Sequence, residues 1–465
     1  MKGSNLNAGG IASRAGADAL YFTSLTVALI RGFGPVPQTL WLSPNNKWVQ
    51  WTLILGNNGL GKSTLLQILA TVSVGKNRYQ EWMLSYDEPD FYDTNRITAK
   101  HDPPRFPFTK SELQTGNCKV GFPLKIVGIT NGKVTEDLFS YGNSFGDMTH
   151  QEKCPSQNFN FNVFAYGPWR SPGQTTLNSR SHTREERVKH LFSSSAELID
   201  GEEWLLSLDY RAEKDNGRRV SKSRERYKQV TTTLVDLLPD VSGIRIVIPN
   251  DVDAGPMVMF ETPFGAVRLK ELGYGYQSLI ALVVDLAARL YNAYPDSPDP
   301  LAEPAICLVD EIDLHLHPSW QRKLMGYLSE RFPRTQFIAT AHSPLVVQAA
   351  EDVGANIVLL RREGDHVVID NDPVSVKGWR VDQILASELF EETPPLGVEA
   401  AEMMKRQKAL LKKPKLTAKE KDELKALNEK AESLPVGTSA KEIELNDRLR
   451  VAVELLEKAA KEKKK

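Results

Sequence analysis

The stretch WTLILGNNGLGKSTLLQILA, residues 51–70, decides the fold of this chain. An apolar strand runs into GNNGLGKS, which matches the pattern G-x-x-x-x-G-K-[ST] from Gly56 to Ser63, and a helix with apolar periodicity follows. Gly59 and Gly61 let backbone N–H groups turn inward around a phosphate, and the positive end of the helix points at the same anion. The stretch therefore predicts a phosphate-binding loop between a buried strand and a helix.

The polar residues of this loop fit a nucleoside triphosphate with its metal ion. Lys62 is expected to reach the β- and γ-phosphates, and the Ser63 hydroxyl to ligate Mg²⁺. A chance glycine-rich turn is the alternative, but it leaves the preceding strand and the following helix unexplained. The sequence therefore predicts a site for ATP and Mg²⁺, with these nucleotide-binding residues: Asn57, Asn58, Gly59, Gly61, Lys62, Ser63 and Thr64.

Polar residues end two further apolar runs. In AICLVDE (305–311), a buried parallel strand would place Asp310 beside the phosphate loop as a second Mg²⁺ ligand, and Glu311 would polarise the attacking water. In QFIATAHSP (336–344), the strand ends at His342, which would contact the γ-phosphate. Glu311 and His342 are therefore the predicted catalytic residues. The alternatives are a strand end with solvated acids and a structural histidine.

A glycine-rich turn opens a helix in LKELGYGYQSLIALVVDLAARL (269–290), without a Ser, Thr, Asp or Asn to cap it. A helix start offers free N–H groups and partial positive charge, which suit an anion. The turn resembles the ABC-ATPase signature sequence, which presents a helix start to the γ-phosphate held by a second subunit. Gly273, Tyr274 and Gly275 are therefore predicted nucleotide contacts. An ordinary helix that begins with glycine is the alternative.

Taken together, GNNGLGKST, LGYGYQS, LVDEIDLHLHPSWQ and TAHSP resemble the stand-alone ABC-type ATPases related to RecF, Rad50 and SMC proteins. The strings DEIDLHLHP, NVFAYGPWR and VDQILASELF are similar to the bacterial group often called AAA-family ATPases. Its members include ATPase subunits of the Septu and PARIS antiphage systems and the ATPase half of OLD nucleases. The resemblance extends over residues 22–395.

The resemblance implies an α/β fold, an ABC-type P-loop ATPase head with a mixed central sheet, an inserted mostly helical lid and a C-terminal helical tail. The expected parts are a flexible tail at 1–20, an ATPase core at 21–80 plus 255–395, a lid at 81–254 and a helical docking region at 396–465. Within the docking region, Thr417 with Glu420 and Ser439 with Glu442 fit capping boxes. No room remains there for the Toprim nuclease domain of OLD proteins.

Three further site assignments follow from the resemblance. DLHLH (313–317) occupies the D-loop, which crosses the dimer interface, although His315 and His317 could instead form part of a metal site. Arg31 and Phe33 match the first-strand region near the nucleotide. The segment from Tyr166 to Arg170 takes the place of the Q-loop, without its glutamine.

The signature departs from the family pattern L-S-x-G, since Gly273 replaces the serine that would bind the opposing γ-phosphate. The backbone N–H groups and the helix dipole remain. We therefore expect ATP-driven pairing with slow hydrolysis of ATP to ADP and phosphate.

Composition limits the partners of this 465-residue chain. Its formal net charge of −1 means that attraction to nucleic acid would come from a local patch. RAEKDNGRRVSKSRERYK (211–228), with eight Lys or Arg against three Asp or Glu, is the candidate patch, and a solvated helix face is the alternative. Three dispersed cysteines fit a reduced cytoplasm, and no apolar run predicts a membrane span.

Two functions follow from these features. The leading hypothesis is an ATPase that forms a homodimer or higher oligomer around ATP. It acts as the sensor or scaffold subunit of a bacterial antiphage complex and controls a separate nuclease. The alternative is a RecF- or SMC-like ATPase that binds DNA in repair or chromosome maintenance.

Overall fold

The computed structural model describes residues 19–27, 31–34, 36–74, 120–130, 133–143, 162–170, 173, 183–214, 222–238, 240–249, 255–391, 397–411, 413 and 417–432. The chain forms two compact units, residues 1–391 and 392–465, and each is described by itself. The predicted tail at 1–20 lies outside the described residues, except for its last two residues, which begin a strand.

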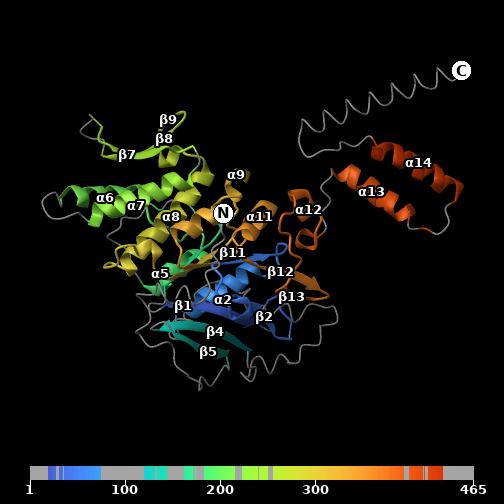
Figure 1. Cartoon of the computed structure of the whole chain (residues 1–465), viewed down its shortest axis with the longest axis horizontal. Helices are drawn as coiled ribbons and strands as arrows, with labels where there is room; N and C mark the ends of the chain where they lie inside the picture. Colours follow the sequence, from blue (N-terminus) through green and yellow to red (C-terminus); the bar gives the residue numbers. More distant parts are fainter. Residues whose placement is uncertain are drawn as a thin grey trace. The chain divides into compact units, whose positions relative to one another are not determined.

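A six-stranded mixed sheet forms the centre of the first unit (Figure 1). Its order is β13 (His366–Asp370), β12 (Asn356–Glu363), β3 (Trp51–Leu55), β11 (Thr335–Thr340), β10 (Ala305–Val309) and β6 (Val163–Tyr166). The strands from β12 to β6 are parallel, and β13 is antiparallel to β12. Unbroken apolar runs such as WTLIL and AICLV form parallel strands because both of their faces are buried. The predicted α/β class with a mixed central sheet is confirmed.

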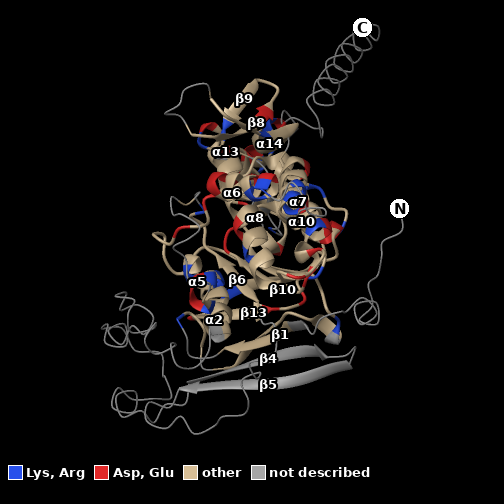
Figure 2. Ribbon diagram, turned by 90° about the vertical axis from the view of Figure 1, so that its left-hand side faces the viewer, with Lys and Arg blue, Asp and Glu red and all other residues tan. Residues whose placement is uncertain are grey.

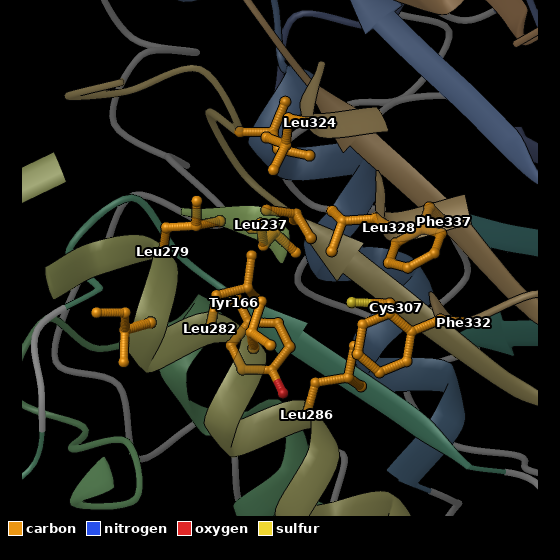
Figure 3. Packing of buried hydrophobic residues seen from close by; sticks show 14 of the residues in the cluster. Tyr166, Leu237, Leu279, Leu282, Leu286, Cys307, Leu324, Leu328, Phe332 and Phe337 are labelled. Carbon is orange, nitrogen blue, oxygen red and sulfur yellow. The ribbon is translucent and has the colours of Figure 1, made fainter. Parts of the chain in front are cut away.

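Alternate residues of each strand enter two separate cores, as the two-residue period of a strand requires. Trp51, Leu53 and Leu55 of β3 share one cluster with α8 (Tyr274–Ala293), α10 (Leu324–Arg331) and α11 (Pro344–Asp352). Figure 3 shows members of this cluster from β6, β10, β11 and α8. Ile54 of β3 joins the other cluster, with the leucines of α2 (Lys62–Val74). The strand that leads into the phosphate loop and the helix that follows the predicted signature therefore share one hydrophobic core.

A second, antiparallel sheet has the order β2 (Gln38–Trp41), β1 (Ala19–Val27), β4 (Val120–Thr130) and β5 (Lys133–Asn143). Its residues Tyr21, Phe22 and Leu25 belong to the α2 cluster. β4, β5 and β6 all fall within residues 81–254, so the predicted lid contains strands as well as helices. The reason is long-range pairing: β4 pairs with β1, and the four apolar residues of β6 are buried on both faces beside β10.

The other described elements of residues 81–254 include α5 (Arg184–Val188), α6 (Gly201–Lys214), α7 (Lys222–Leu237) and β7 (Gly243–Val247). β7 forms a three-stranded antiparallel sheet with β8 (Met257–Thr262) and β9 (Gly265–Arg268), which fall in the segment predicted as core. Trp204 and Leu208 of α6 and Leu234 of α7 share the α8 cluster. This subdomain therefore rests on the signature helix. No described helix combines the length and the apolar composition that a bilayer crossing needs.

The second unit contains α13 (Val398–Leu411) and α14 (Ala418–Glu432). The Arg406 guanidinium donates to both Glu423 carboxylate oxygens, at 2.7 and 3.0 Å. Glu420 N–H donates to Thr417 Oγ1 at 3.3 Å, and Thr417 N–H donates to the Glu420 carboxylate at 2.9 Å. The first predicted capping box is confirmed, and the one at 439–442 lies outside the described residues.

Candidate nucleotide-binding site

The loop after β3 has a backbone that glycine adopts more readily than any other residue. Gly56, Gly59 and Gly61 have φ angles of 138°, 81° and 88°. A Cβ atom on Gly56 would lie 2.7 Å from the carbonyl oxygen of Leu360, and one on Gly61 would lie 3.1 Å from the ring of Phe33. Both conformation and space therefore require glycines at the first and last of these positions.

Lys62, the first residue of α2, folds over this loop. Its Nζ donates to the carbonyl oxygens of Gly56 at 2.6 Å and Asn57 at 3.0 Å. Burial lowers the pKa of Lys62, while the carboxylates of Asp310 and Glu311 act in the opposite direction. The ammonium group thus lies within the loop and faces the acidic side of the site.

The other predicted residues of the loop surround this lysine in the chain. Asn57 and Asn58 are exposed, and Ser63 is half-buried on the first helical turn. Thr64 is buried and accepts a hydrogen bond from Arg31 Nη1 at 2.9 Å. Arg31 and Phe33, assigned by resemblance alone, therefore lie against the phosphate loop.

The two carboxylates lie at the carboxyl edge of the sheet, where β3, β10 and β11 end side by side. Asp310 is buried and accepts a hydrogen bond from Thr340 Oγ1 at 2.6 Å. The same Thr340 oxygen accepts from Glu311 N–H at 2.7 Å. One hydroxyl on β11 thus orients both predicted acidic residues, and the sequence analysis did not identify it.

His342 follows β11 at the same edge, with an exposed side chain. Its backbone N–H donates to Asp313 Oδ2 at 2.8 Å. The structure therefore brings His342 together with the loop of residues 56–64 and with the Asp310–Glu311 pair. All three follow neighbouring strands of one sheet.

The signature turn begins α8 without a side-chain cap, with Gly273 at the capping position. A Cβ atom on Gly275 would lie 2.4 Å from the carbonyl oxygen of His315. The ring of Tyr274 packs edge-to-face on the His315 ring at 4.7 Å, and Tyr276 packs in the same way on Trp320 at 4.1 Å. Tyr274 and Gly275 of the predicted signature therefore lie against His315 of the predicted D-loop in the same chain.

The D-loop histidines have structural contacts of their own. His317 caps α9 (Pro318–Gln321) by accepting a hydrogen bond from Ser319 N–H at 3.3 Å. His315 has a φ of 63° and contacts Tyr274. Among the described residues, no group of three or more His, Cys, Asp or Glu side chains could hold a metal ion. Both histidines therefore have contacts within the chain, and the D-loop assignment stays a prediction.

Arg170, the last residue of the Tyr166–Arg170 segment, lies directly beneath the acidic pair. It is 2% exposed, and its Nη1 donates to the carbonyl oxygens of Asp310 at 2.7 Å and Gly167 at 3.0 Å. Its Nη2 donates to the Glu311 carbonyl oxygen at 2.9 Å. Burial lowers the pKa of Arg170 to about 10, against the opposing effect of Asp310 and neighbouring carboxylates. The sequence placed this arginine in the Q-loop position but gave it no role.

A buried carboxylate joins this segment to the signature helix. Asp285, in the middle of α8, is fully buried and accepts hydrogen bonds from the Tyr166 hydroxyl at 2.9 Å and from Ile199 N–H at 3.0 Å. Arg289 Nε also donates to it. Three donors compensate the cost of burying this charge. The aspartate within VVDLAARL was the available signal, since it interrupts an otherwise apolar helix.

Comparison with known proteins finds a matching family model and several related proteins. Residues 177–348 match the family described as "AAA domain, putative AbiEii toxin, Type IV TA system". The chain is 27% identical over 400 residues to the Septu protein PtuA of Bacillus mycoides, covering 84% of this chain and 48% of that protein. It is 29% identical over 285 residues to the retron Vc95 probable ATPase of Vibrio cholerae, covering 60% of this chain and 48% of that protein. The chain thus spans about half the length of these two relatives. The predicted resemblance to ATPases of antiphage systems is confirmed.

Solved structures with some similarity include an SMC head bound to the C-winged helix domain of ScpA. It has a TM-score of 0.37 and 15% identity, and the match covers 75% of this chain and 97% of that one. A RecF structure has a TM-score of 0.35 and 12% identity, with 76% and 99% coverage.

Proposed function

We propose, from the premise that this chain is related to the ATPases of Septu and retron systems, that it binds and hydrolyses ATP with Mg²⁺ in the cytoplasm. It assembles as a homodimer or higher oligomer around ATP. It serves as the sensor or scaffold subunit of an antiphage complex that controls a separate nuclease. The observation that carries the ATPase activity is the hydrogen-bonded chain from Glu311 through Thr340 to Asp310, beside Lys62.

The residues present fit a magnesium nucleotide. The loop's positive φ angles turn its backbone around the Lys62 ammonium, as binding of an anionic phosphate chain requires. The Ser63 hydroxyl and the Asp310 carboxylate are hard oxygen donors, which Mg²⁺ prefers. When bound, Mg²⁺ neutralises charge that develops on the phosphates.

The chain's own residues then perform three tasks. Lys62 neutralises the β- and γ-phosphates. Glu311, whose backbone N–H is held by Thr340, orients the attacking water and accepts its proton. His342 contacts the γ-phosphate from the next strand end.

Two substitutions test the ATPase activity. Glu311→Gln should retain ATP binding but reduce the hydrolysis rate by about 100-fold or more, because the general base is lost. Lys62→Ala should abolish binding of a fluorescent ATP analogue. Glu391→Gln is the control, since Glu391 is a glutamate with a similar positive φ, 54° against 48° for Glu311, and this variant should hydrolyse ATP at the wild-type rate. A Glu311→Gln protein that hydrolyses ATP normally would falsify this assignment.

The proposed dimer pairs the signature turn of one chain with the γ-phosphate held by the other. The turn's uncapped helix start and the 42% exposed Tyr274 support this role. Glu311→Gln should therefore accumulate as an ATP-dependent dimer in light scattering after gel filtration. A protein that remains monomeric with ATP and Mg²⁺, and whose rate per chain does not change on dilution, contradicts the paired site.

The defence role rests on the relatives' names, and its partner-binding part is tested by deletion of residues 396–465. A neighbouring nuclease should co-purify with the full chain and be lost from the truncated one. Cells that carry the operon should resist phage, and Lys62→Ala should remove this resistance. If the truncated chain still binds the nuclease, the docking surface lies outside residues 396–465.

The RecF- or SMC-like alternative rests on the basic segment 211–228. Its residues Lys214, at the end of α6, and Arg224 and Lys228, in the first half of α7, are exposed, and 215–221 lie outside the described residues. Figure 2 shows acidic as well as basic residues on these helices. Salt-dependent DNA binding that is lost when these three basic residues become glutamine would favour the alternative.

A further inference from the structure

The Glu311 backbone is held in a conformation that non-glycine residues rarely adopt. Its φ is +48°, in the left-handed region, immediately after β10 ends. A backbone of this kind persists where surrounding contacts fix it.

Arg170 supplies those contacts from a segment 140 residues earlier in the chain. Its planar guanidinium donates to the carbonyl oxygens of both Asp310 and Glu311, at 2.7 and 2.9 Å. Fixing two successive carbonyls fixes the two peptide planes that follow Asp310 and Glu311. The orientation of Glu311 is thereby set from beneath, while Thr340 sets it from β11.

His190 holds the segment that carries Arg170. Its Nδ1 accepts from Gly167 N–H at 2.9 Å, so its Nε2–H donates to the Trp169 carbonyl oxygen at 3.1 Å. The fit is close, because a Cβ atom on Gly167 would lie 2.7 Å from the His190 carbonyl oxygen. His190 is 6% exposed, and its two hydrogen bonds hold the backbone of Gly167 and Trp169, just before Arg170.

We infer that Arg170 is a positioning residue for ATP hydrolysis, which acts through Glu311 and is itself aligned by His190. This inference rests on the proposed function, because it assigns Glu311 as the base. Arg170 does not contact the phosphate loop in any of its hydrogen bonds given above. Its loss should therefore lower kcat and leave ATP affinity unchanged.

Arg170→Lys is the informative substitution. It keeps the positive charge, but an ammonium group on a flexible stem does not reproduce a planar fork that spans two carbonyls. Misplacement of a catalytic group by about 1 Å can reduce the rate by about 100-fold. We expect a reduction of that order in kcat, with the KM for ATP and the binding of an ATP analogue unchanged.

The double variant Arg170→Lys, Glu311→Gln separates positioning from general damage. If Arg170 acts through Glu311, the double variant should hydrolyse ATP as slowly as Glu311→Gln alone, because the base that Arg170 orients is already absent. Independent, multiplying losses would overturn the inference, as would a wild-type kcat in Arg170→Lys.

Two further variants complete the experiment. Arg187→Lys is the matched control, since Arg187 is a half-buried arginine that donates to Asn162 Oδ1 at the other end of β6, at 2.6 Å; the kcat of this variant should be unchanged. His190→Leu removes the two hydrogen bonds that hold the segment of Arg170, and it tests the same inference if Arg170→Lys does not fold. It should lower kcat in the wild-type background but cause no further loss of kcat in the Glu311→Gln background. If the wild-type chain itself does not hydrolyse ATP, the proposed function fails rather than the role of Arg170.

Discussion

Two glycines of the signature turn, Gly273 and Gly275, allow substitutions that should change the free energy of unfolding in opposite directions. A Cβ atom on Gly275 would lie 2.4 Å from the His315 carbonyl oxygen and 3.3 Å from its carbonyl carbon, both backbone atoms. Because neither atom can rotate away as a side chain would, Gly275→Ala must push α8 and the D-loop apart. Overpacking of this kind costs about 1–3 kcal/mol.

Gly273 differs, since a Cβ atom at this position would have the Tyr276 ring as its nearest neighbour, at 3.8 Å, an ordinary contact. Its φ of −56° and ψ of 149° suit serine at a helix N-cap. Gly273→Ser should therefore leave the fold intact and add about a few tenths of a kcal/mol. It also restores the serine of the family pattern, so ATP-dependent dimerisation and turnover should increase.

Urea denaturation measures the free energy of unfolding of both variants, and gel filtration with light scattering measures the dimer in the Glu311→Gln background. Gly275→Ala should be destabilised and form less dimer with ATP. A Gly275→Ala protein as stable as wild type would refute the contact with His315. Unchanged dimerisation in Gly273→Ser would refute the role of the turn as the partner's phosphate contact.

Three further substitutions test the interior of the site. Thr340→Val should cost about 1–3 kcal/mol in urea denaturation, because Glu311 N–H loses its acceptor, and should lower kcat more than ATP affinity. Asp285→Ala should cost about 3–5 kcal/mol by the same measurement, since Arg289 is left as an unpaired buried charge. Burial lowers the pKa of His190 from 6.5 to about 4. Between these two pH values the unfolded chain therefore binds a proton at His190 that the folded chain does not bind. The free energy of unfolding should therefore fall by about 3 kcal/mol as pH drops from 6.5 to 4, with a smaller fall in His190→Leu.

The local parts of the site could be predicted from sequence because each is encoded in consecutive residues. Such parts are the glycines of the phosphate loop, the apolar run before Asp310 and the glycine start of α8. In each, the residue types themselves indicate the local backbone geometry. These runs also predict that Asp310 lies beside the phosphate loop, since both follow the carboxyl ends of parallel strands in one sheet. Cys307, in the run AICLV, is buried core, as its apolar neighbours indicate.

The supporting residues could not be predicted because their contacts join distant segments. Arg170 meets Asp310 across 140 positions, and Thr340 meets it across 30. β6 contributes only four apolar residues, too few for a periodic signal, and its place is decided by pairing with β10. The strands within residues 81–254 could not be predicted for the same reason: β4 pairs with β1, which lies about a hundred residues earlier.

These distant contacts join both halves of the proposed pocket within one chain. The start of α8 packs on the D-loop through Gly275, and Asp285, in the same helix, holds the Tyr166 hydroxyl. Tyr166 also receives Asp310 N–H at its carbonyl oxygen, at 2.8 Å, immediately before the segment that ends in Arg170. A shift of α8 caused by a partner's nucleotide would therefore strain the hydrogen bonds that align Glu311. Tyr166→Phe removes one of these bonds without removing the charge pair, so it should weaken the dependence of hydrolysis on dimerisation more than it weakens the fold. Equal dependence on protein concentration in wild type and Tyr166→Phe would show that the two halves act independently.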